Sequence, residues 1–328
     1  MTGDLPYLIF DQKDSGSFSD TALRIFKFQA DNNPVYRHFI SSLGRTVSGI
    51  KNIGDIPFLP VEFFKSQTVA IENQSFETIF ESSMTTGDTP SRHFVHDLKL
   101  YEKSFQNSFR YFYGDPSEYF IAALLPSYGQ RQNSSLIYMM NGLIKKSRKS
   151  NSGFYDDNPE DLIRNIKLAK ASGQKRILLG VSFALLDLAN NYSPDLSGTI
   201  VMETGGMKGQ SKEITREELH EILKAKLNIE SVHSEYGMTE LLSQSYSKGN
   251  GIFHCPPWMK ILIRDPQDPL TVSGEQGKTG GINIIDLANI YSCSFIATSD
   301  FGKLHENGSF GISGRFDNSD IRGCNLMA

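Results

Sequence analysis

The sequence predicts an α/β protein in which mixed and parallel sheets are covered by helices, with a smaller β-rich C-terminal portion. Three observations predict this class. From about residue 95, apolar strand-like runs alternate with amphipathic helices, which is typical of a parallel sheet with helical crossovers. After Gly249, short strands are separated by Gly, Pro and Asp turns. The 328 residues, 39% of them hydrophobic, suffice for a large core in one domain or two.

Helices are expected at the N-terminal end. The run "SDTALRIFKFQA" (19–30) has apolar residues at helical spacing, with Ser19 as the expected N-cap. In "NPVYRHFISSLG" the expected cap is Asn33, and Pro34 takes the first helical position. These two helices form the entry to the core.

Helices and strands then alternate along the chain. Helices are expected at 101–114, 134–146, 157–173, 182–191 and 215–228, and strands at 118–127, 175–181, 197–206 and 229–237. Thr215 and Glu218 form a capping box at the start of the last helix. Strands at 259–266, 280–286 and 293–300 follow. We therefore expect a helical entry and α/β core over 1–250 and a β-rich portion, packed on that core, over 251–328.

Composition excludes several classes of protein. With 33 basic and 37 acidic residues the net charge is −4, so a nucleic-acid partner is not expected. No run of 18 apolar residues occurs and the N-terminus lacks a basic signal region, so neither a membrane span nor secretion is expected. Three cysteines without a CxxC pair indicate a reduced, cytoplasmic protein. The adjacent His254 and Cys255 do not by themselves make a metal site.

The stretch "ESSMTTGDTPSR" (81–92) is a candidate phosphate-binding loop. Hydroxyl groups and free backbone N–H groups in a glycine-containing loop bind phosphate oxygens. The loop lacks the first glycine and the Lys-Ser/Thr ending of a Walker loop, and an ordinary polar loop is the alternative. The candidate ligands are Ser82, Ser83, Thr85, Thr86 and Gly87.

Two further candidate segments each follow a predicted strand, where ligands bind in parallel α/β sheets. In "METGGMKG", Gly205 and Gly206 let a flat ligand approach the backbone. In "SEYGMTE", Tyr236 offers a stacking face, Thr239 a hydroxyl and Glu240 a hard oxygen ligand for Mg²⁺. Taken singly, each segment is equally explained as a turn.

Two late residues complete the set. Asp300 in "TSDFG" is expected at a strand end, where a carboxylate suits a ribose diol, and Arg315 in "GRFD" is expected on a tight turn. An arginine there binds hydroxyls or phosphate. Either one alone is better explained as a surface turn.

In this order the segments resemble the adenylate-forming superfamily of acyl-CoA synthetases, adenylation domains and luciferases. Within it the chain is most similar to the acyl-protein synthetase branch of bacterial luminescence systems, related to phenylacetate-CoA ligase. The resemblance spans residues from about 50 to 328, and "EYGMTE" and the Ser/Thr/Gly loop are its most specific parts. It implies the large N-terminal domain of that fold, and an enzyme that uses ATP and Mg²⁺ to activate a small fatty or aromatic acid as an acyl-adenylate. The acyl group then passes to a thiol.

The resemblance also implies a role for each motif residue. Ser82, Ser83, Thr85, Thr86 and Gly87 would bind the pyrophosphate part of ATP; Gly205, Gly206 and Met207 would contact adenine; Tyr236 would stack on adenine; Thr239 would touch the α-phosphate; Glu240 would hold Mg²⁺; and Asp300, assisted by Arg315, would grip the ribose.

The sequence departs from the family pattern in two places. Met84 stands where a glycine is usual, and Arg92 would replace the loop lysine. After "GRFD" about a dozen residues follow and the last lysine is Lys303. The family's C-terminal lid domain and its lysine are therefore expected to be absent, with Lys208 as a substitute charge or a partner protein supplying the lid.

The acyl acceptor stays open at this point. Acyl-protein synthetases carry the acyl group on a cysteine near the C-terminus, so Cys324 is the candidate here, with a small packed residue as the alternative. A partner protein or free coenzyme A would also serve, the latter in an acyl- or aryl-CoA ligase. Two more alternatives are a non-catalytic nucleotide-binding partner and a hydrolase with Ser182 as nucleophile, although Ala184 breaks the Gly-x-Ser-x-Gly pattern.

Overall fold

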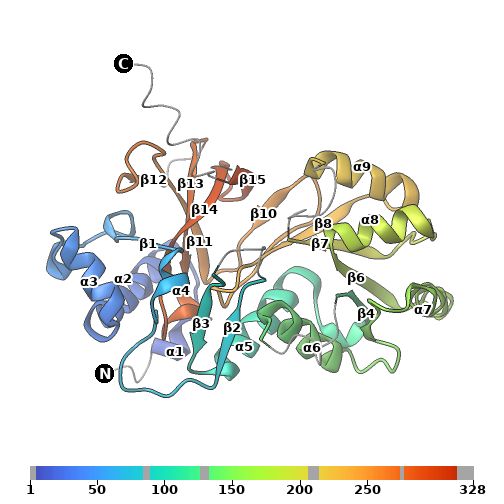
Figure 1. The fold of residues 1–328 in the computed structure, drawn as a ribbon, viewed down its shortest axis with the longest axis horizontal. Coiled ribbons are helices and arrows are strands. Elements are labelled where there is room, and N and C mark those ends of the chain that lie inside the picture. The colour runs from blue at the N-terminus through green and yellow to red at the C-terminus, as the bar shows by residue number, and fades with distance from the viewer. Residues whose placement is uncertain (1–4, 84–88, 126–132, 206–213, 274–276, 316–328) are drawn as a thin grey trace. The chain divides into compact units, whose positions relative to one another are not determined.

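The chain divides into two units. The first unit combines the N-terminal segment Met1–Ser75 with the C-terminal segment Pro257–Ala328, and the second unit is Phe76–Pro256. The computed structural model describes residues 5–83, 89–125, 133–205, 214–273 and 277–315 (Figure 1). The predicted division at residue 250 kept the N-terminal helices with the α/β core. In the structure they belong with the β-rich segment instead.

The first unit is an antiparallel sheet with N-terminal helices. Its elements are α1 (Leu5–Leu8), α2 (Ser15–Asn32), α3 (Pro34–Ser42), short 3₁₀ turns at Val47–Gly49 and Ile53–Asp55, β1 (Leu59–Pro60), α4 (Phe63–Ser66), β11 (Met259–Arg264), β12 (Val272–Ser273), β13 (Thr279–Asp286), a 3₁₀ turn at Leu287–Asn289, β14 (Phe295–Leu304) and β15 (Phe310–Arg315). The strand order is β12-β11-β13-β14-β15, and β1 pairs with β14 in parallel. The short strands expected after Gly249 are present in this part of the chain, and they pair antiparallel.

A buried glutamine ties the N-terminal helices to this sheet. Gln29 on α2 donates through Nε2 to the carbonyl oxygens of Asn289 and Ile290, each at 2.9 Å. Its Oε1 accepts from the Ser294 backbone N–H at 3.0 Å. The side chain is fully buried, where unpaired amide groups would be costly. These bonds span about 260 residues of sequence, which explains why local patterns did not predict the partnership.

The second unit is a parallel sheet with a hairpin before it and helices between its strands. Its elements are β2 (Thr78–Glu81), β3 (Arg92–Val95), α5 (Leu98–Tyr113), a 3₁₀ turn at Pro116–Glu118, β4 (Tyr119–Leu124), α6 (Ser135–Ser147), β5 (Gly153–Phe154), α7 (Pro159–Ala171), β6 (Lys175–Val181), α8 (Ser182–Asn191), β7 (Ile200–Thr204), α9 (Arg216–Leu227), β8 (Val232–Tyr236), β9 (Ser245–Ser247) and β10 (Ile252–His254). Strands β5, β4, β6, β7 and β8 are parallel neighbours in that order, and β9 and β10 continue the sheet antiparallel. The predicted parallel, helix-covered sheet is confirmed.

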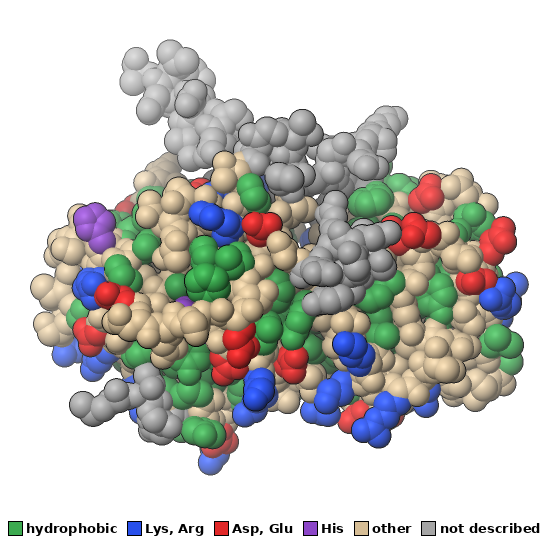
Figure 2. Space-filling model, turned by 60° about the horizontal axis from the view of Figure 1, so that its bottom comes forward, with side chains coloured by type: hydrophobic (Ala, Val, Ile, Leu, Met, Phe, Trp, Pro, Cys, Tyr) green, Lys and Arg blue, Asp and Glu red, His purple; other side chains and the backbone are tan. Residues whose placement is uncertain are grey.

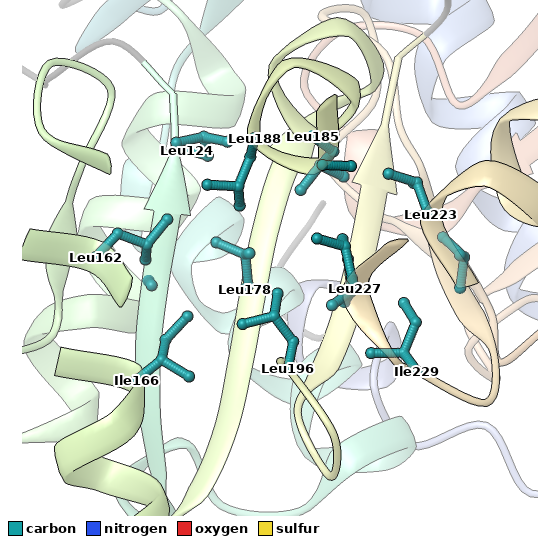
Figure 3. Packing of buried hydrophobic residues seen from close by; sticks show 14 of the residues in the cluster. Leu124, Leu162, Ile166, Leu178, Leu185, Leu188, Leu196, Leu223, Leu227 and Ile229 are labelled. Atoms are coloured by element: carbon teal, nitrogen blue, oxygen red, sulfur yellow. The ribbon is translucent and has the colours of Figure 1, made fainter. Parts of the chain in front are cut away.

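Helices cover both faces of the parallel sheet. Figure 1 shows α8 and α9 on one side of β6 and β7, and α6 on the other. The face under α7, α8 and α9 carries a large apolar core, in which Leu178 of β6 lies between Leu162, Leu185 and Leu223 of the helices (Figure 3). Burying a leucine of this kind contributes about 1.5–3 kcal/mol to the free energy of folding. This core therefore stabilises the packing of the helices on the sheet.

Capping residues explain several helix boundaries. Thr215 accepts from the Glu218 N–H at 3.2 Å and Glu218 accepts from the Thr215 N–H at 2.9 Å, so the predicted capping box is confirmed. Asn33 caps α3, also as predicted. Ser19 is not a cap: α2 begins earlier, and Asp14 caps it through the N–H of Ser17 at 2.8 Å.

The visible face in Figure 2 carries acidic and basic side chains mixed with polar and hydrophobic ones. Within the ranges that the structure describes, no helix has both the length and the apolar composition needed to cross a membrane.

Candidate active site

The candidate residues of the second unit lie where β7 and β8 end and where the β2–β3 hairpin turns. In a parallel sheet these carboxyl ends meet at one edge, which is where ligands bind. The residues Gly206, Met207, Thr85, Thr86, Gly87, Met84, Lys208 and Cys324 lie outside the described part of the chain.

The exit of β7 is formed by Gly205, the one described residue of the predicted adenine loop. Its φ of +72° lies in the left-handed region, which glycine adopts without steric cost. Its carbonyl oxygen lies 3.0 Å from the Ser182 hydroxyl at the start of α8. The backbone is therefore held at the point where the loop begins.

Ser182 does not have the surroundings of a serine nucleophile. Its hydroxyl is buried and lies 3.2 Å from the Glu203 carboxylate as well as 3.0 Å from the Gly205 carbonyl. His220 lies beyond Glu203, 3.7 Å from the carboxylate. In a catalytic triad the imidazole lies between the serine and the carboxylate. Here the carboxylate of Glu203 lies between Ser182 and His220.

The exit of β8 carries Tyr236, the predicted stacking residue. Its ring packs edge-on against Phe253 of β10, with ring centres 5.9 Å apart. Its hydroxyl donates to the sulfur of Met238 at 3.9 Å. The side chain is 8% exposed, so its position is fixed by packing within the unit.

Thr239 and Glu240 form the turn after β8, closed by the Leu241 N–H donating to the Met238 carbonyl at 3.1 Å. His93 of β3 supports this turn, because its Nδ1 lies 2.8 Å from the Thr239 carbonyl oxygen. A carbonyl only accepts, so Nδ1 carries the hydrogen. This contact joins the hairpin of the predicted phosphate loop to the "EYGMTE" turn.

The hairpin is also held at the base of its loop. The Ser82 N–H donates to the Ser91 carbonyl at 3.0 Å, and the Ser91 N–H donates to the Ser82 hydroxyl at 2.9 Å. Phe80 of β2 packs edge-on against Tyr101 of α5 with ring centres 5.5 Å apart. Ser83 follows directly at the start of the loop. The sequence analysis assigned residues 81–92 to a loop and did not predict the two strands that flank it.

Glu240 fits a metal that is delivered with a nucleotide. Mg²⁺ in phosphate-transfer sites takes one or two protein carboxylates and completes its shell with phosphate oxygens and water. Glu240 is a largely buried carboxylate on a supported turn. Over the described ranges, no group of three or more His, Cys, Asp or Glu residues could hold a metal without such a ligand.

The α9-facing side of the β7 exit holds a buried charge network that the sequence analysis missed. The Glu203 carboxylate lies 3.2 Å from Arg216 Nε and 3.7 Å from His220 Nε2, both on α9. Burial alone would raise the pKa of Glu203, yet His220 and Arg216 hold that pKa below its ordinary value. The signal in the sequence was a single acidic residue inside the apolar run "TIVMET".

The opposite face of the same strands carries a second buried acid, Glu235 of β8. The Thr204 hydroxyl donates to its Oε2 at 2.5 Å. Burial, reinforced by the charge of Glu203, outweighs this bond and raises the pKa of Glu235 to about 7. A Cβ placed on Gly237 would collide with Oε1 of the same carboxyl group, so Glu235 occupies the space that a side chain at 237 would need.

The predicted ribose pair belongs to the first unit. Arg315 Nε donates to Asp300 Oδ1 at 3.0 Å, and the Asp300 N–H donates to the Thr298 hydroxyl at 3.1 Å. The side chain of Asp300 is 8% exposed and that of Arg315 is 55% exposed. The expected locations were wrong: Asp300 lies within β14 rather than at its end, and Arg315 ends β15 directly opposite it.

The two described cysteines are free thiols with different surroundings. Cys293 is fully buried, and burial raises its pKa to about 12. Such a thiol is a poor nucleophile because the thiolate is the reactive form. Cys255 is half-buried, with its sulfur 3.3 Å from the Ser245 hydroxyl.

A surface hollow of about 490 Å³ lies beside α8, with Leu124, Phe183 and Tyr192 among its lining residues. Asp156 and Asp187 also line it. Two acidic side chains disfavour a carboxylate ligand, so we do not assign the acid substrate to this hollow.

No protein-family model matches the sequence, and no curated protein matches it either. Several solved structures are similar in fold. An ATP-bound chimera of RpMatB and BxBclM gives a TM-score of 0.55 at 19% identity, covering 75% of this chain and 49% of that one. ATP-bound MatB from Rhodopseudomonas palustris gives 0.55 at 15% identity, with the same 75% and 49% coverage. A 2-hydroxyisobutyryl-CoA ligase, in the postadenylation state in complex with R3-HIB-AMP, gives 0.65 at 12% identity and covers 94% and 69%.

The chain therefore has a fold similar to that of these MatB and CoA-ligase structures, and the predicted fold class is confirmed. It spans about half the length of the MatB structures, at 49% of each. At these identities the similarity establishes the fold alone.

Proposed function

We propose that this protein uses ATP to activate a carboxylic acid as an acyl-adenylate and transfers the acyl group to a protein thiol. The observation that carries the proposal is the contact between His93 and the Thr239 carbonyl. It joins the hairpin of the predicted phosphate loop to the turn of the predicted α-phosphate and metal residues. The fold shared with ATP-bound MatB supports the same reading.

In the first step a carboxylate oxygen bonds to the α-phosphorus of ATP, and the bond to the pyrophosphate oxygen breaks. Two anions must approach each other, so their charge has to be neutralised by donors and cations placed in advance. In this proposal the Thr239 hydroxyl donates to the α-phosphate, Glu240 binds Mg²⁺, and the Ser82 loop donates to the leaving pyrophosphate. Mg²⁺ supplies charge neutralisation on the phosphate oxygens.

In the second step a thiolate sulfur bonds to the acyl carbon and AMP leaves with the electron pair of the broken anhydride bond. The resemblance to acyl-protein synthetases supports a protein thiol, either Cys324 or a cysteine of a partner. Cys293 is unsuited because its thiol is buried and its pKa is raised. Cys255 is the matched control among the remaining cysteines.

The first experiment is carboxylate-dependent exchange of labelled pyrophosphate into ATP, run over fatty and aromatic acids with and without Mg²⁺. We expect exchange with at least one acid and none without Mg²⁺. Nucleotide binding without exchange for any acid, with or without candidate partner proteins, would contradict the proposal and favour a non-catalytic nucleotide-binding protein.

The second experiment identifies the acceptor. Labelled acid and ATP should give a hydroxylamine-sensitive thioester on the protein that is lost in Cys324→Ser and kept in Cys255→Ser. Labelling only when a partner protein is added would place the thiol on the partner. The name of the similar 2-hydroxyisobutyryl-CoA ligase supports a second candidate function, in which free coenzyme A accepts the acyl group. Free acyl-CoA as the product would decide for this acyl-CoA ligase activity.

A further inference from the structure

Glu203 is a buried charge that the proposed reaction does not use. It is 2% exposed near the end of β7 and faces α8 and α9. Removing a carboxylate from water costs several kcal/mol even when it is paired. A buried ion pair is therefore weak evidence for stability. The role of Glu203 follows instead from the groups that its two carboxylate oxygens hold in place.

The first oxygen reaches the loop after β7. Oε2 of Glu203 lies 3.2 Å from the Ser182 hydroxyl, which in turn lies 3.0 Å from the Gly205 carbonyl oxygen. A serine hydroxyl has one hydrogen, shared here between two acceptors. The Gly205 carbonyl is thus fixed at the residue where the chain takes its left-handed conformation.

The second oxygen reaches the tyrosine after β8. Oε1 of Glu203 lies 3.2 Å from Arg216 Nε, and the Arg216 guanidinium lies 5.5 Å above the Phe253 ring. Phe253 packs edge-on against Tyr236. The carboxylate orients the guanidinium, the guanidinium covers one aromatic ring, and that ring supports the next.

We propose that Glu203 is a positioning residue for the nucleotide base, because it holds both Gly205 and Tyr236 through separate chains of contacts. This inference rests on the proposed function, in which these two residues contact adenine. The two chains of contacts lead from Glu203 to Gly205 and to Tyr236, the described residues of the predicted base site. We therefore expect loss of the Glu203 carboxylate to weaken recognition of the base more than recognition of the phosphates.

The test is Glu203→Gln, which keeps the size of the side chain but leaves it a single acceptor oxygen. Binding of ATP and of inorganic pyrophosphate is measured by calorimetry, since pyrophosphate reports the phosphate site without a base. We expect the Kd for ATP to rise about tenfold, the loss expected for a hydrogen bond to a charged group, while the Kd for pyrophosphate stays as in the wild type.

A matched control is Arg176→Lys. Arg176 is a buried charge of the same unit at the start of β6, where it donates to the Thr199 hydroxyl at 3.1 Å and the Gly198 carbonyl at 3.0 Å. This variant should lose stability but keep both Kd values. Ser182→Ala cuts only the chain to Gly205 and leaves the ion pair intact, so it tests the inference even if Glu203→Gln fails to fold. It should weaken ATP about threefold, with pyrophosphate unchanged.

Three outcomes overturn the inference: unchanged ATP binding in both variants, an equal loss of ATP and pyrophosphate binding, or the same loss in Arg176→Lys. If the wild type exchanges pyrophosphate and any of these results is found, the inference fails and the proposed function stands. If the wild type binds no ATP, both fall together.

Discussion

The two faces of the parallel sheet at the ends of β7 and β8 hold the same kind of residue in opposite ways. On the face toward α9, Glu203 lies beside Arg216 and its pKa is lowered. On the face toward α5, Glu235 is bonded to the Thr204 hydroxyl and its pKa is raised to about 7. The strands are adjacent, so the difference comes from what each face offers the carboxylate.

On the face toward α5, the cation Lys248 lies over the Tyr113 ring, 5.7 Å from its centre, while Glu235 is bonded to the neutral Thr204 hydroxyl. His233 lies on this face, bonded to the Tyr113 hydroxyl at 3.1 Å, and burial, together with the nearby charge of Lys248, lowers its pKa to about 4. It is therefore neutral at neutral pH. A buried acid keeps its charge where a cation is built beside it, and otherwise takes a proton. One face therefore holds a carboxylate whose pKa is lowered, and the other holds a carboxylate whose pKa is raised.

The largest effect is expected at the turn of Thr239 and Glu240, which His93 supports. Glu240→Gln keeps the shape of the turn but removes the anionic oxygen needed for Mg²⁺. We expect carboxylate-dependent pyrophosphate exchange to fall about a thousandfold, the upper range for loss of one transition-state contact. Exchange within about threefold of the wild type would remove Glu240 from the metal site.

The second prediction tests the charge state of Glu235 through the pH dependence of stability. Its pKa is about 7 when folded against an ordinary 4.5, so between these values the native state holds a proton that the unfolded state has lost. Stability therefore falls as pH rises through this window and is level above it.

Glu235→Gln should remove that loss, because the amide oxygen still accepts from Thr204 and carries no charge. Urea unfolding should give similar free energies of unfolding for the variant and the wild type at about pH 5. At about pH 8 the variant should be more stable by up to about 3 kcal/mol. Parallel pH curves for the two proteins would show that Glu235 stays ionised.

The third prediction separates support of the metal turn from support of the base. His93→Ala removes the donor to the Thr239 carbonyl, and we expect kcat for exchange to fall about tenfold. His93→Asn places an N–H near the position of Nδ1 and should restore most of the rate. The Kd for ATP should not change relative to the Kd for pyrophosphate, in contrast to Glu203→Gln. A change in the KM for ATP alone would contradict this distinction between the two supports.

The smallest effect is expected for a hydroxyl pair between α5 and the segment after the turn. The Ser104 and Ser243 hydroxyls lie 3.0 Å apart and are fully buried. A double-mutant cycle with both serines changed to alanine should give a coupling of about 1 kcal/mol in the free energy of unfolding. A coupling near zero would mean that the turn is fixed by His93 without this contact.

Local chemistry made some features predictable from sequence. The caps at Asn33 and Thr215 depend on residues three positions away, and the alternation of strands and helices gave the parallel sheet. Gly205 directly follows β7 as predicted, whereas Tyr236 is the last residue of β8 rather than a residue after it.

Contacts between distant segments could not be predicted. Gln29 meets residues about 260 positions away, and His93 meets Thr239, 146 positions away. In the sequence nothing distinguishes Glu203 from other acidic residues, because its contacts with Ser182 and Arg216 form only in the folded chain. Asp300 was misplaced because an antiparallel partner continued its strand beyond the expected end.

The space shared by Glu235 and Gly237 links the two positions in evolution. A Cβ at 237 would overlap with Glu235 Oε1, so alanine at 237 requires the Glu235 carboxyl to move from its place beside Thr204. A shorter residue at 235 would vacate that space and make the same alanine acceptable. Related sequences should therefore change these positions together, with the substitution at 235 arising first.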